Sequence, residues 1–272
     1  MRPSFAKNGC AKSANSAGSR RPLPINVSDV TAVILTRDEQ RNLPRALASL
    51  PVGMPVLVLD AHSTDRTAQI AREAGATVVR RAWTNFVDAR LFALAHVETP
   101  WTLMIDADEE LDAPLRAAIA EARGADCFSV SRTTLFCGRP MRMWSDEPLL
   151  RLFRTGTARL EALPATGGGT PLHERWVAQG PVARLAGTLV HHSYPTVRSY
   201  RNKFARYTTI ESQRAGRGSP FMLVVRAPVA LARFAYTLFL RGGIRDGWPG
   251  LYVALFSALY PLAVAHKRYW KR

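Results

Sequence analysis

The first half of the chain alternates short apolar runs with segments whose apolar residues recur at helical spacing. Four runs are typical of strands buried on both faces: Val30–Thr36, Pro55–Asp60, Thr77–Arg80 and Trp101–Ile105. Between them, the spacing predicts helices through residues 43–50, over 66–74 and around 88–96. Ser63 or Thr64 is expected to cap the second of these helices, and Gly75 to end it. This order predicts an α/β fold with a Rossmann-like, mostly parallel sheet.

The pattern changes near residue 197. Val197–Arg217 is typical of an amphipathic helix, and the strongly apolar Phe221–Leu240 contains Arg226 and Arg233. Two arginines within one segment oppose spanning a bilayer, and they share one helix face, as in helices that lie in the membrane interface. Leu251–Ala265 offers about 15 apolar residues, fewer than the ~20 that cross a bilayer. We therefore predict a helical, membrane-associating extension that lies on the membrane; a re-entrant or spanning hairpin is the alternative.

Charge divides the chain into three predicted parts. The net charge is +16, yet residues 29–197 carry 18 basic and 19 acidic groups. Residues 1–28 carry five basic groups and no acidic one, and 198–272 carry 14 basic and two acidic groups. We expect a disordered basic tail over 1–28, a globular domain over 29–197 and a basic amphipathic extension over 198–272.

The basic extension needs an anionic partner. Its cationic residues alternate with long aliphatic runs, and no zinc-finger or RNA-binding motif is present. An anionic membrane surface is therefore expected rather than nucleic acid. The three cysteines, Cys10, Cys127 and Cys137, show no metal-ligand spacing.

Acidic residues follow three of the predicted strands. Asp38 and Glu39 follow the first, Asp60 ends the second, and Asp106 and Asp108 follow the fourth. Ligands of parallel sheets lie beyond the carboxyl ends of the strands. Residues two apart on an extended backbone point to one side, so Asp106 and Asp108 are expected to converge and could hold Mg²⁺ or Mn²⁺. The alternative for this stretch is the acidic, solvated start of a helix.

Three motifs resemble the signatures of family 2 glycosyltransferases of GT-A fold: residues 36–39 (TRDE), 59–67 (LDAHSTDRT) and 105–109 (IDADE). Further segments are similar to the branch that adds sugars to the lipopolysaccharide inner core: residues 90–94, 151–154, 173–174, 191–194 and 243–247. The resemblance covers roughly residues 30–270. It departs at Asp38, where the family usually has Asn, and at Leu91, where the family has Asn after Arg.

The resemblance implies an inverting, metal-dependent glycosyltransferase. The aromatic and basic residues that flank Leu251–Ala265 indicate attachment to the cytoplasmic side of the inner membrane. Its GT-A catalytic domain would move a sugar from a nucleotide-sugar donor, expected to be a UDP-hexose, to a lipid-linked saccharide such as the lipopolysaccharide inner core. It places the donor against Thr36, Asp38, Glu39, Asp60, Arg90 and Asp106. It implies that Asp106, Asp108 and His191 bind a divalent metal (Mg or Mn). It also implies that Glu174 is the catalytic base, with Asp146 as the alternative base.

Other interpretations of these residues stay open at this point. Glu174 could be a surface carboxylate paired with Arg175 or Arg184, and His191 could be structural. Arg151 and Arg154 could bind a diphosphate or lie on a solvated strand edge. The whole chain could also be a catalytically silent scaffold that keeps the fold and binds a membrane assembly.

Overall fold

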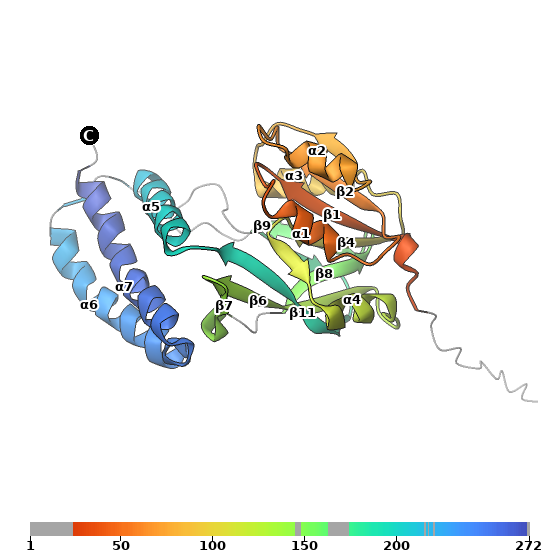
Figure 1. Cartoon of the computed structure of the whole chain (residues 1–272). Coiled ribbons are helices and arrows are strands. Elements are labelled where there is room, and N and C mark those ends of the chain that lie inside the picture. The colour runs from red at the N-terminus through yellow and green to blue at the C-terminus, as the bar shows by residue number, and fades with distance from the viewer. Residues whose placement is uncertain are drawn as a thin grey trace, which may run out of the picture.

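Four parallel strands form one half of the central sheet (Figure 1). They are β1 (Val30–Thr36), β2 (Val56–Asp60), β3 (Thr77–Arg80) and β4 (Trp101–Asp106), in the spatial order β3-β2-β1-β4. The computed structural model describes residues 24–144, 148–162, 174–214, 216, 218–219 and 221–270. All four predicted strands are present, and the bounds agree within one residue.

The sheet continues with strands of mixed direction. Beyond β4 the order is β8 (Leu149–Arg154), β6 (Cys127–Phe136), β11 (Val182–Tyr194) and β5 (Glu109–Leu111), while β7 (Arg139–Pro140) pairs with β6. β8 is antiparallel to both β4 and β6, whereas β6 and β11 are parallel. A separate ribbon pairs β9 (Ala158–Ala162) with β10 (Glu174–Ala178). The sheet is thus mostly parallel in its first half and mixed in its second.

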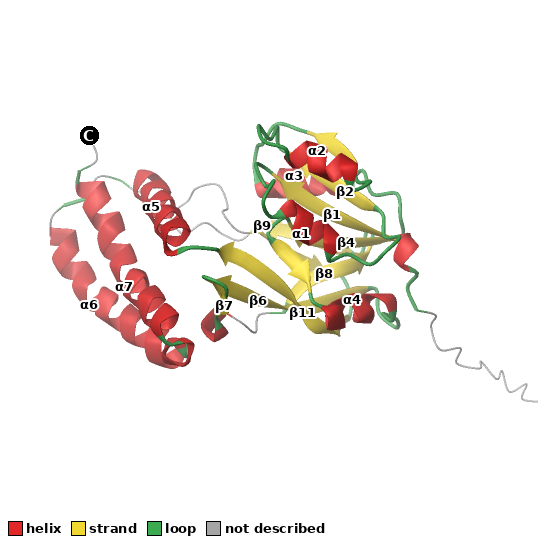
Figure 2. Cartoon of the chain, viewed as in Figure 1, coloured by secondary structure: helices red, strands yellow, loops and turns green. Residues whose placement is uncertain are grey.

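Helices cover both faces of the sheet (Figure 2). Alternate residues of β1 point to opposite faces, so Ile34 joins a cluster with Leu43 of α1 (Leu43–Ala48) and Leu115 of α4 (Ala113–Ala120). Val33 joins the opposite cluster with Ala89 of α3 (Phe86–Leu94). Burial on both faces explains the continuous apolar runs of these strands.

The cap expected for α2 (Thr67–Glu73) is formed differently. Neither Ser63 nor Thr64 caps this helix; Asp65 accepts a hydrogen bond from the Thr67 amide at 2.9 Å. Ser63 and Thr64 instead bond to Asp38 in the neighbouring loop. The sequence rule failed because a tertiary partner competes for both hydroxyl groups.

Order begins earlier than predicted at the N-terminal side. Ile25 is buried, and its amide donates to the Ala122 carbonyl at 2.9 Å. A short 3₁₀ turn, η1 (Val27–Asp29), then leads into β1. Residues 24–28 are therefore part of the globular structure, and the rest of the predicted tail, 1–23, lies outside the described residues.

The C-terminal extension consists of helices lying beside the sheet (Figure 1). They are α5 (Val197–Arg214), α6 (Phe221–Ala235), the π-helical η3 (Tyr236–Leu240), the 3₁₀ turn η4 (Gly243–Asp246) and α7 (Trp248–Tyr269). Phe136 of β6 joins the two parts, packing against Tyr200 of α5 and Trp248 of α7 at ring-centroid distances of 5.3 and 5.8 Å. Asp246 of η4 accepts from the amides of Arg142 and Met143 in the 3₁₀ turn η2 (Arg142–Trp144).

Two helical stretches are long and apolar enough to cross a membrane by length and composition alone. They are Phe221–Leu240 and Trp248–Tyr269, of 20 and 22 residues. The second is longer than the 15-residue run predicted from the sequence, because the helix continues through the polar residues that flank Leu251–Ala265. Only 11% and 33% of these two segments are buried within the protein, so neither is a core helix.

Candidate active site

The register of the parallel strands brings the acidic residues to one edge of the sheet. Thr36 at the end of β1 lies opposite Asp60 of β2, and Leu35 lies opposite Asp106 of β4. Asp60 and Asp106 therefore flank the end of β1, about two strand spacings, or roughly 10 Å, apart. The expected position of the carboxylates at the carboxyl ends of the strands is confirmed for these two residues.

Asp60 is held in a buried pocket of donors. Its side chain is fully buried and accepts from Arg80 Nε at 3.1 Å and from the Ser63 amide at 3.2 Å. Thr36 is also buried and donates through its hydroxyl to Asp60 at 3.5 Å. The orientation of the Asp60 carboxylate is thus fixed by donors from the end of β1, the end of β3 and the loop after β2.

Asp38 ties the loop after β1 to the loop after β2. Its backbone is left-handed, with φ of 57°, a conformation that Asp tolerates better than most residues. Its carboxylate accepts from the Thr64 amide at 2.8 Å, and its own amide donates to Ser63 Oγ at 2.9 Å. In this position an Asn oxygen could accept the same bonds, so the departure from the family pattern is structurally conservative.

Glu39 lies deeper than Asp38. Its amide donates to Thr67 Oγ1 at 2.8 Å, and its carboxylate accepts from Asn42 Nδ2 at 2.8 Å. Burial raises the pKa of Glu39; the bond from Asn42 opposes this, and the nearby charge of Asp108 adds to the increase. Glu39 therefore belongs to the same electrostatic environment as Asp108.

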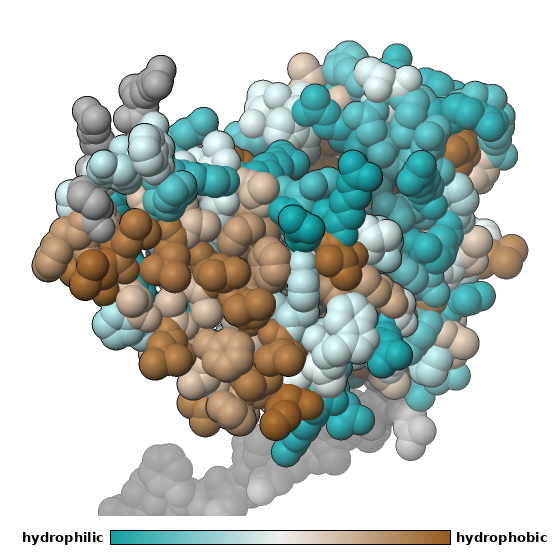
Figure 3. Space-filling view, turned by 60° about the vertical axis from the view of Figure 1, so that its left-hand side comes forward, coloured by the Kyte–Doolittle hydropathy of each residue, from teal (hydrophilic) through white to brown (hydrophobic). Residues whose placement is uncertain are grey.

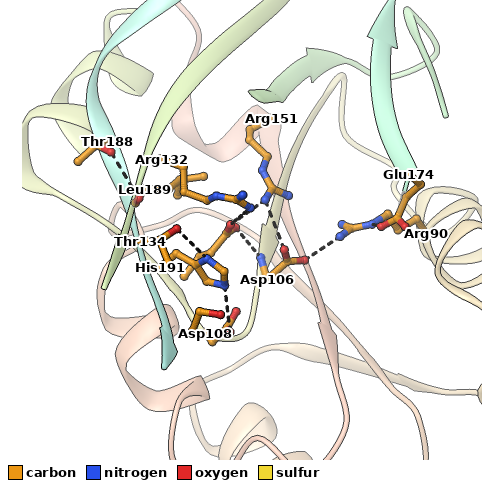
Figure 4. Close-up of polar contacts among 12 residues, drawn as sticks. Arg90, Asp106, Asp108, Arg132, Thr134, Arg151, Glu174, Thr188, Leu189 and His191 are labelled. Carbon is orange, nitrogen blue, oxygen red and sulfur yellow. Dashed lines mark hydrogen bonds and ion pairs between the residues drawn. The ribbon is translucent and has the colours of Figure 1, made fainter. Parts of the chain in front are cut away.

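Asp106 lies between two buried arginines (Figure 4). Arg90 Nη2 donates to Asp106 Oδ1 at 2.8 Å and Arg151 Nη2 donates to Oδ2 at 3.3 Å. Burial alone would raise the pKa of Asp106, but the two guanidinium groups outweigh it and hold the pKa well below its usual range. Both carboxylate oxygens are therefore occupied by arginine in this structure.

Glu109 is the most buried carboxylate of the motif. Its side chain accepts from Arg151 Nη2 at 2.7 Å and from the Asp106 amide at 3.0 Å, and Arg132 Nη1 approaches to 3.8 Å. Burial raises the pKa of Glu109, Arg151 lowers it, and the charge of Asp106 raises it further, for a net increase. The alternative prediction of a solvated helix start is wrong, because Glu109 begins the buried strand β5.

Asp108 is the last residue of the turn between β4 and β5, whereas Asp106 is the last residue of β4. The extended backbone on which convergence with Asp106 was predicted is absent here, and the two side chains contact different partners. Asp108 Oδ2 lies 3.2 Å from His191 Nε2, and Thr134 Oγ1 lies 3.3 Å from the other ring nitrogen. Within the ranges that the structure describes, no group of three or more acidic, histidine or cysteine side chains could hold a metal.

A second carboxylate–histidine pair lies beside the first. His192 Nε2 is 2.9 Å from Glu110 Oε2, and Arg45 Nε lies 3.1 Å from the same oxygen. The pairing of β11 with β5 places His191 opposite Glu109, so the two histidines of β11 meet the turn and strand that carry the carboxylates. Neither Glu110 nor His192 was assigned a role from the sequence.

Glu174 reaches the site through Arg90. The Nε of Arg90 donates to Glu174 Oε1 at 2.9 Å, while its Nη2 group bonds Asp106, so one guanidinium joins both carboxylates (Figure 4). The surface pairings considered for Glu174 are not formed: Arg175 pairs with Glu161, and Arg184 donates to Ser131. Asp146, the alternative base, lies outside the described residues.

Arg90 and Arg151 also carry unused donors. Arg90 Nη1 and Arg151 Nε are buried and have no hydrogen-bond partner within the described part of the chain. The attraction of Asp106 and Glu174 outweighs burial and raises the pKa of Arg90, which stays charged. The two buried cations with free N–H groups are the part of the site that fits an anionic ligand.

Comparison with known proteins assigns the chain to a family. The model of "Glycosyl transferase family 2" matches residues 31–171, just over half of the chain. The "Lipopolysaccharide core biosynthesis glycosyltransferase LpsC" of Rhizobium meliloti (strain 1021) is 27% identical over 258 residues, covering 88% of this chain and 92% of the relative. An uncharacterized glycosyltransferase of Rickettsia bellii (strain RML369-C) is 38% identical over 91 residues, covering 33% of this chain and 31% of that protein.

Among solved structures, the chain is similar to the mannosyltransferase PcManGT of Pyrobaculum calidifontis, which was solved in complex with GDP-Man and Mn²⁺. The similarity covers 93% of this chain and 88% of that one, with a TM-score of 0.49 and 16% identity. The family match covers the four parallel strands and the acidic motif at their ends. The predicted GT-A fold and enzyme class are confirmed, and the chain belongs to the glycosyl transferase family 2.

Proposed function

We propose that this glycosyltransferase is an inverting, metal-dependent enzyme that moves a sugar from a nucleotide-sugar donor, a UDP-hexose, to a lipid-linked saccharide of the lipopolysaccharide inner-core type. The observation that carries the proposal is the position of Asp60 and Asp106 at one edge of the sheet, with Asp106 held between the buried Arg90 and Arg151. The acceptor class is supported by the similarity to LpsC along most of the chain.

The donor would bind along the strand ends. Asp60 is acceptor-only when ionised and suits the imide N–H of a uracil base. Arg90 Nη1 and Arg151 Nε offer buried donors to phosphate or sugar oxygens. Thr36, Asp38 and Glu39 would form the neighbouring wall, since their loop is tied to Ser63, Thr64 and Thr67.

The residues fit a divalent metal that is shared with a diphosphate. Mg²⁺ and Mn²⁺ are usually held by one or two protein carboxylates together with substrate phosphates, so a complete protein cage is not required. Asp108 and His191 supply an oxygen and a nitrogen within 3.2 Å of each other. Asp106, also predicted as a ligand, has both oxygens bonded to arginines, which favours Asp108 for this role. When bound, the ion would stabilise negative charge on the leaving nucleoside diphosphate.

Glu174 is proposed as the base that takes the proton of the acceptor hydroxyl. It begins β10, its side chain is 10% exposed, and Arg90 fixes it beside Asp106. A carboxylate held in this way is oriented before the acceptor arrives, which is what general base catalysis needs. Asp146 stays the alternative.

The extension would attach the enzyme to the cytoplasmic leaflet without crossing it. Large apolar side chains are exposed along both long helical stretches, among them Phe221, Leu231, Leu240, Leu251 and Leu255. Figure 3 shows a broad hydrophobic area on one side of the molecule. Arg226 and Arg233 are exposed on α6, as expected for a helix in the interface plane. Release by detergent and not by nuclease would separate membrane attachment from nucleic-acid binding.

A donor screen tests the function directly. The full chain is incubated with UDP- and GDP-hexoses, Mn²⁺ and a bacterial lipid extract, and released nucleoside diphosphate is measured. We expect release that depends on the acceptor extract and on the metal, and that is greatest with a UDP-hexose. Nucleotide binding without release under every combination would indicate a silent scaffold and reject the proposal.

A further inference from the structure

A groove of about 240 Å³ lies among the C-terminal helices and the nearby residues Met143, Trp144 and Tyr194. On α7 it is lined by Val253, Phe256, Ser257 and Tyr260, which recur at helical spacing and therefore share one face. On α5 it is lined by Tyr200 and Phe204, one turn apart. The groove is distinct from the carboxylate site and is not used by the chemistry described above.

Aromatic rings form one wall of the groove. Phe204 meets Phe256 edge-on at a centroid distance of 5.0 Å, and Tyr194 lies 5.3 Å from Trp144. All four side chains line the groove. Packed aromatic rings offer rigid apolar faces, against which the C–H face of a sugar ring packs well.

Two cationic side chains also line the groove. Arg233, Thr237 and Arg241 line the groove at intervals of four residues along α6 and η3. In the part of the chain that the structure describes, neither arginine forms an ion pair with a carboxylate; Arg233 lies over the Tyr260 ring at 5.8 Å. Glu211, which is not among the lining residues, accepts from the Tyr260 hydroxyl at 2.7 Å. Two guanidinium groups without acidic partners suit a phosphate.

The groove is connected to the carboxylate site through β11. Tyr194 is three residues beyond His191 on this strand, a separation of roughly 10 Å. Lys203 of α5 bridges the two, since its Nζ donates to Ser193 Oγ at 3.1 Å and lies 4.9 Å from the Tyr194 ring centroid. A ligand in the groove would therefore lie next to the site where sugar transfer is proposed.

The groove also borders the exposed apolar surface. Phe239 and Leu240, beside Arg241, are 60% and 79% exposed. A molecule with an apolar tail on that surface would place its polar headgroup against the arginines. Arg241 of the groove thus adjoins the exposed apolar surface, and Tyr194 of the groove lies on the strand that carries His191.

We propose that this groove binds the headgroup of the lipid-linked acceptor, namely a saccharide that carries phosphate close to its lipid anchor. The phosphate lies between Arg233 and Arg241, and the sugar packs on the rings of Tyr194, Phe204 and Phe256. The identification of this ligand as the acceptor rests on the proposed function, whereas the binding of an anionic glycolipid does not.

Equilibrium binding of a soluble glycolipid tests the groove. The full chain in phosphatidylcholine nanodiscs is titrated with radiolabelled octyl glucoside 6-phosphate, with empty nanodiscs subtracted. The variant Arg233→Gln/Arg241→Gln is compared with Arg226→Gln/Arg245→Gln, which removes the same charge from exposed positions of the extension outside the groove. We expect at least tenfold weaker binding in the groove variant and less than twofold change in the control.

Two further measurements decide the interpretation. Arg241→Gln alone is expected to weaken glycolipid binding at least threefold. Because the Arg241 side chain is exposed, this single variant tests the groove even if the double variant folds poorly. Uncharged octyl glucoside is expected to bind more weakly than the phosphate and equally to all variants. Equal loss in both double variants, or equal affinity for charged and uncharged glucoside, would overturn the proposal.

Failure of the proposed function gives a different result. UDP binding with Mn²⁺ is measured on the same preparations and is expected to be unchanged by the groove variant. If the glycolipid binds through Arg233 and Arg241 but no UDP binds, the groove is a glycolipid site and the proposed metal-dependent use of a UDP-sugar fails. If nucleotide binds and transfer proceeds while the groove variant keeps full glycolipid affinity, only the groove proposal fails.

Discussion

Replacing Arg90 by Met should destabilise the protein far more than a similar change on the surface. The Arg90 side chain is 6% exposed and bonds two carboxylates, Asp106 at 2.8 Å and Glu174 at 2.9 Å. Met keeps most of the apolar stem but removes the charge, leaving both carboxylates without this partner. Removing one member of a buried ion pair costs about 3–5 kcal/mol. Because Asp106 is 32% exposed and keeps Arg151, the lower end, about 3 kcal/mol, is expected.

Urea denaturation of the detergent-solubilised protein, followed by tryptophan fluorescence, measures this loss. With an m-value of about 2 kcal/mol/M, a loss of ~3 kcal/mol lowers the midpoint by about 1.5 M. Arg159→Met is the control, since Arg159 pairs with Glu161 at 2.7 Å but is 63% exposed. An exposed pair is worth about 0.2–1 kcal/mol, so the control should move the midpoint by less than ~0.5 M. Equal shifts in both variants would refute the view that buried Arg90 organises the site.

Three other predictions test the packing at Gly187, the charge of Asp106 and the role of Glu174. Gly187→Ala should lower the free energy of unfolding, measured by urea denaturation, by at least ~3 kcal/mol, because the added Cβ would lie 2.2 Å from the Leu115 amide nitrogen at a φ of +86°. The control Gly75→Ala has a φ of +80° but open space around the added Cβ, and should lower it by only about 1–2 kcal/mol. In the folded protein the pKa of Asp106 lies below the unfolded value of 3.8, so the stability that ionised Asp106 contributes is complete above pH 3.8 and is lost as the pH falls below it. Asp106→Asn should therefore lower the melting temperature at pH 6, and the melting temperature of this variant should decrease less toward pH 3 than that of the wild type. Glu174→Gln should reduce kcat about 10²–10⁴-fold with unchanged UDP affinity, and a larger loss in Asp146→Asn would move the base to that residue.

The parallel half of the fold could be predicted because its signals are local. Continuous apolar runs such as Val30–Thr36 specify strands buried on both faces, and the intervening helices have their own periodicity. Strands β6, β8 and β11 lack such signals, since their residues alternate irregularly between buried and partly exposed positions. Their pairing depends on contacts across long sequence separations, which one sequence does not display.

The site was predictable in its residue types more than in its contacts. The carboxylates of the 105–109 motif were identified from the sequence. The burial of Glu109 in a strand could not be foreseen, because it depends on an ion pair with Arg151, 42 residues away. The alternative for Glu174 was a surface pair with Arg175 or Arg184, close in sequence, but Glu174 bonds Arg90, 84 residues away. Burial of a charged group requires a partner, and long-range tertiary structure selects which partner that is.

The central claim is that the sheet edge binds a nucleoside diphosphate through a metal held by Asp108. Isothermal titration with UDP and GDP, with and without Mn²⁺, tests it on the wild-type chain, on Asp108→Asn and on Glu110→Gln. Glu110 is the matched control, since it also pairs with a histidine, at 2.9 Å against 3.2 Å for Asp108. We expect Mn²⁺ to tighten nucleotide binding at least tenfold in the wild type and in Glu110→Gln, and not in Asp108→Asn. Metal-linked binding that persists in Asp108→Asn, or that is absent from the wild type, would contradict the account.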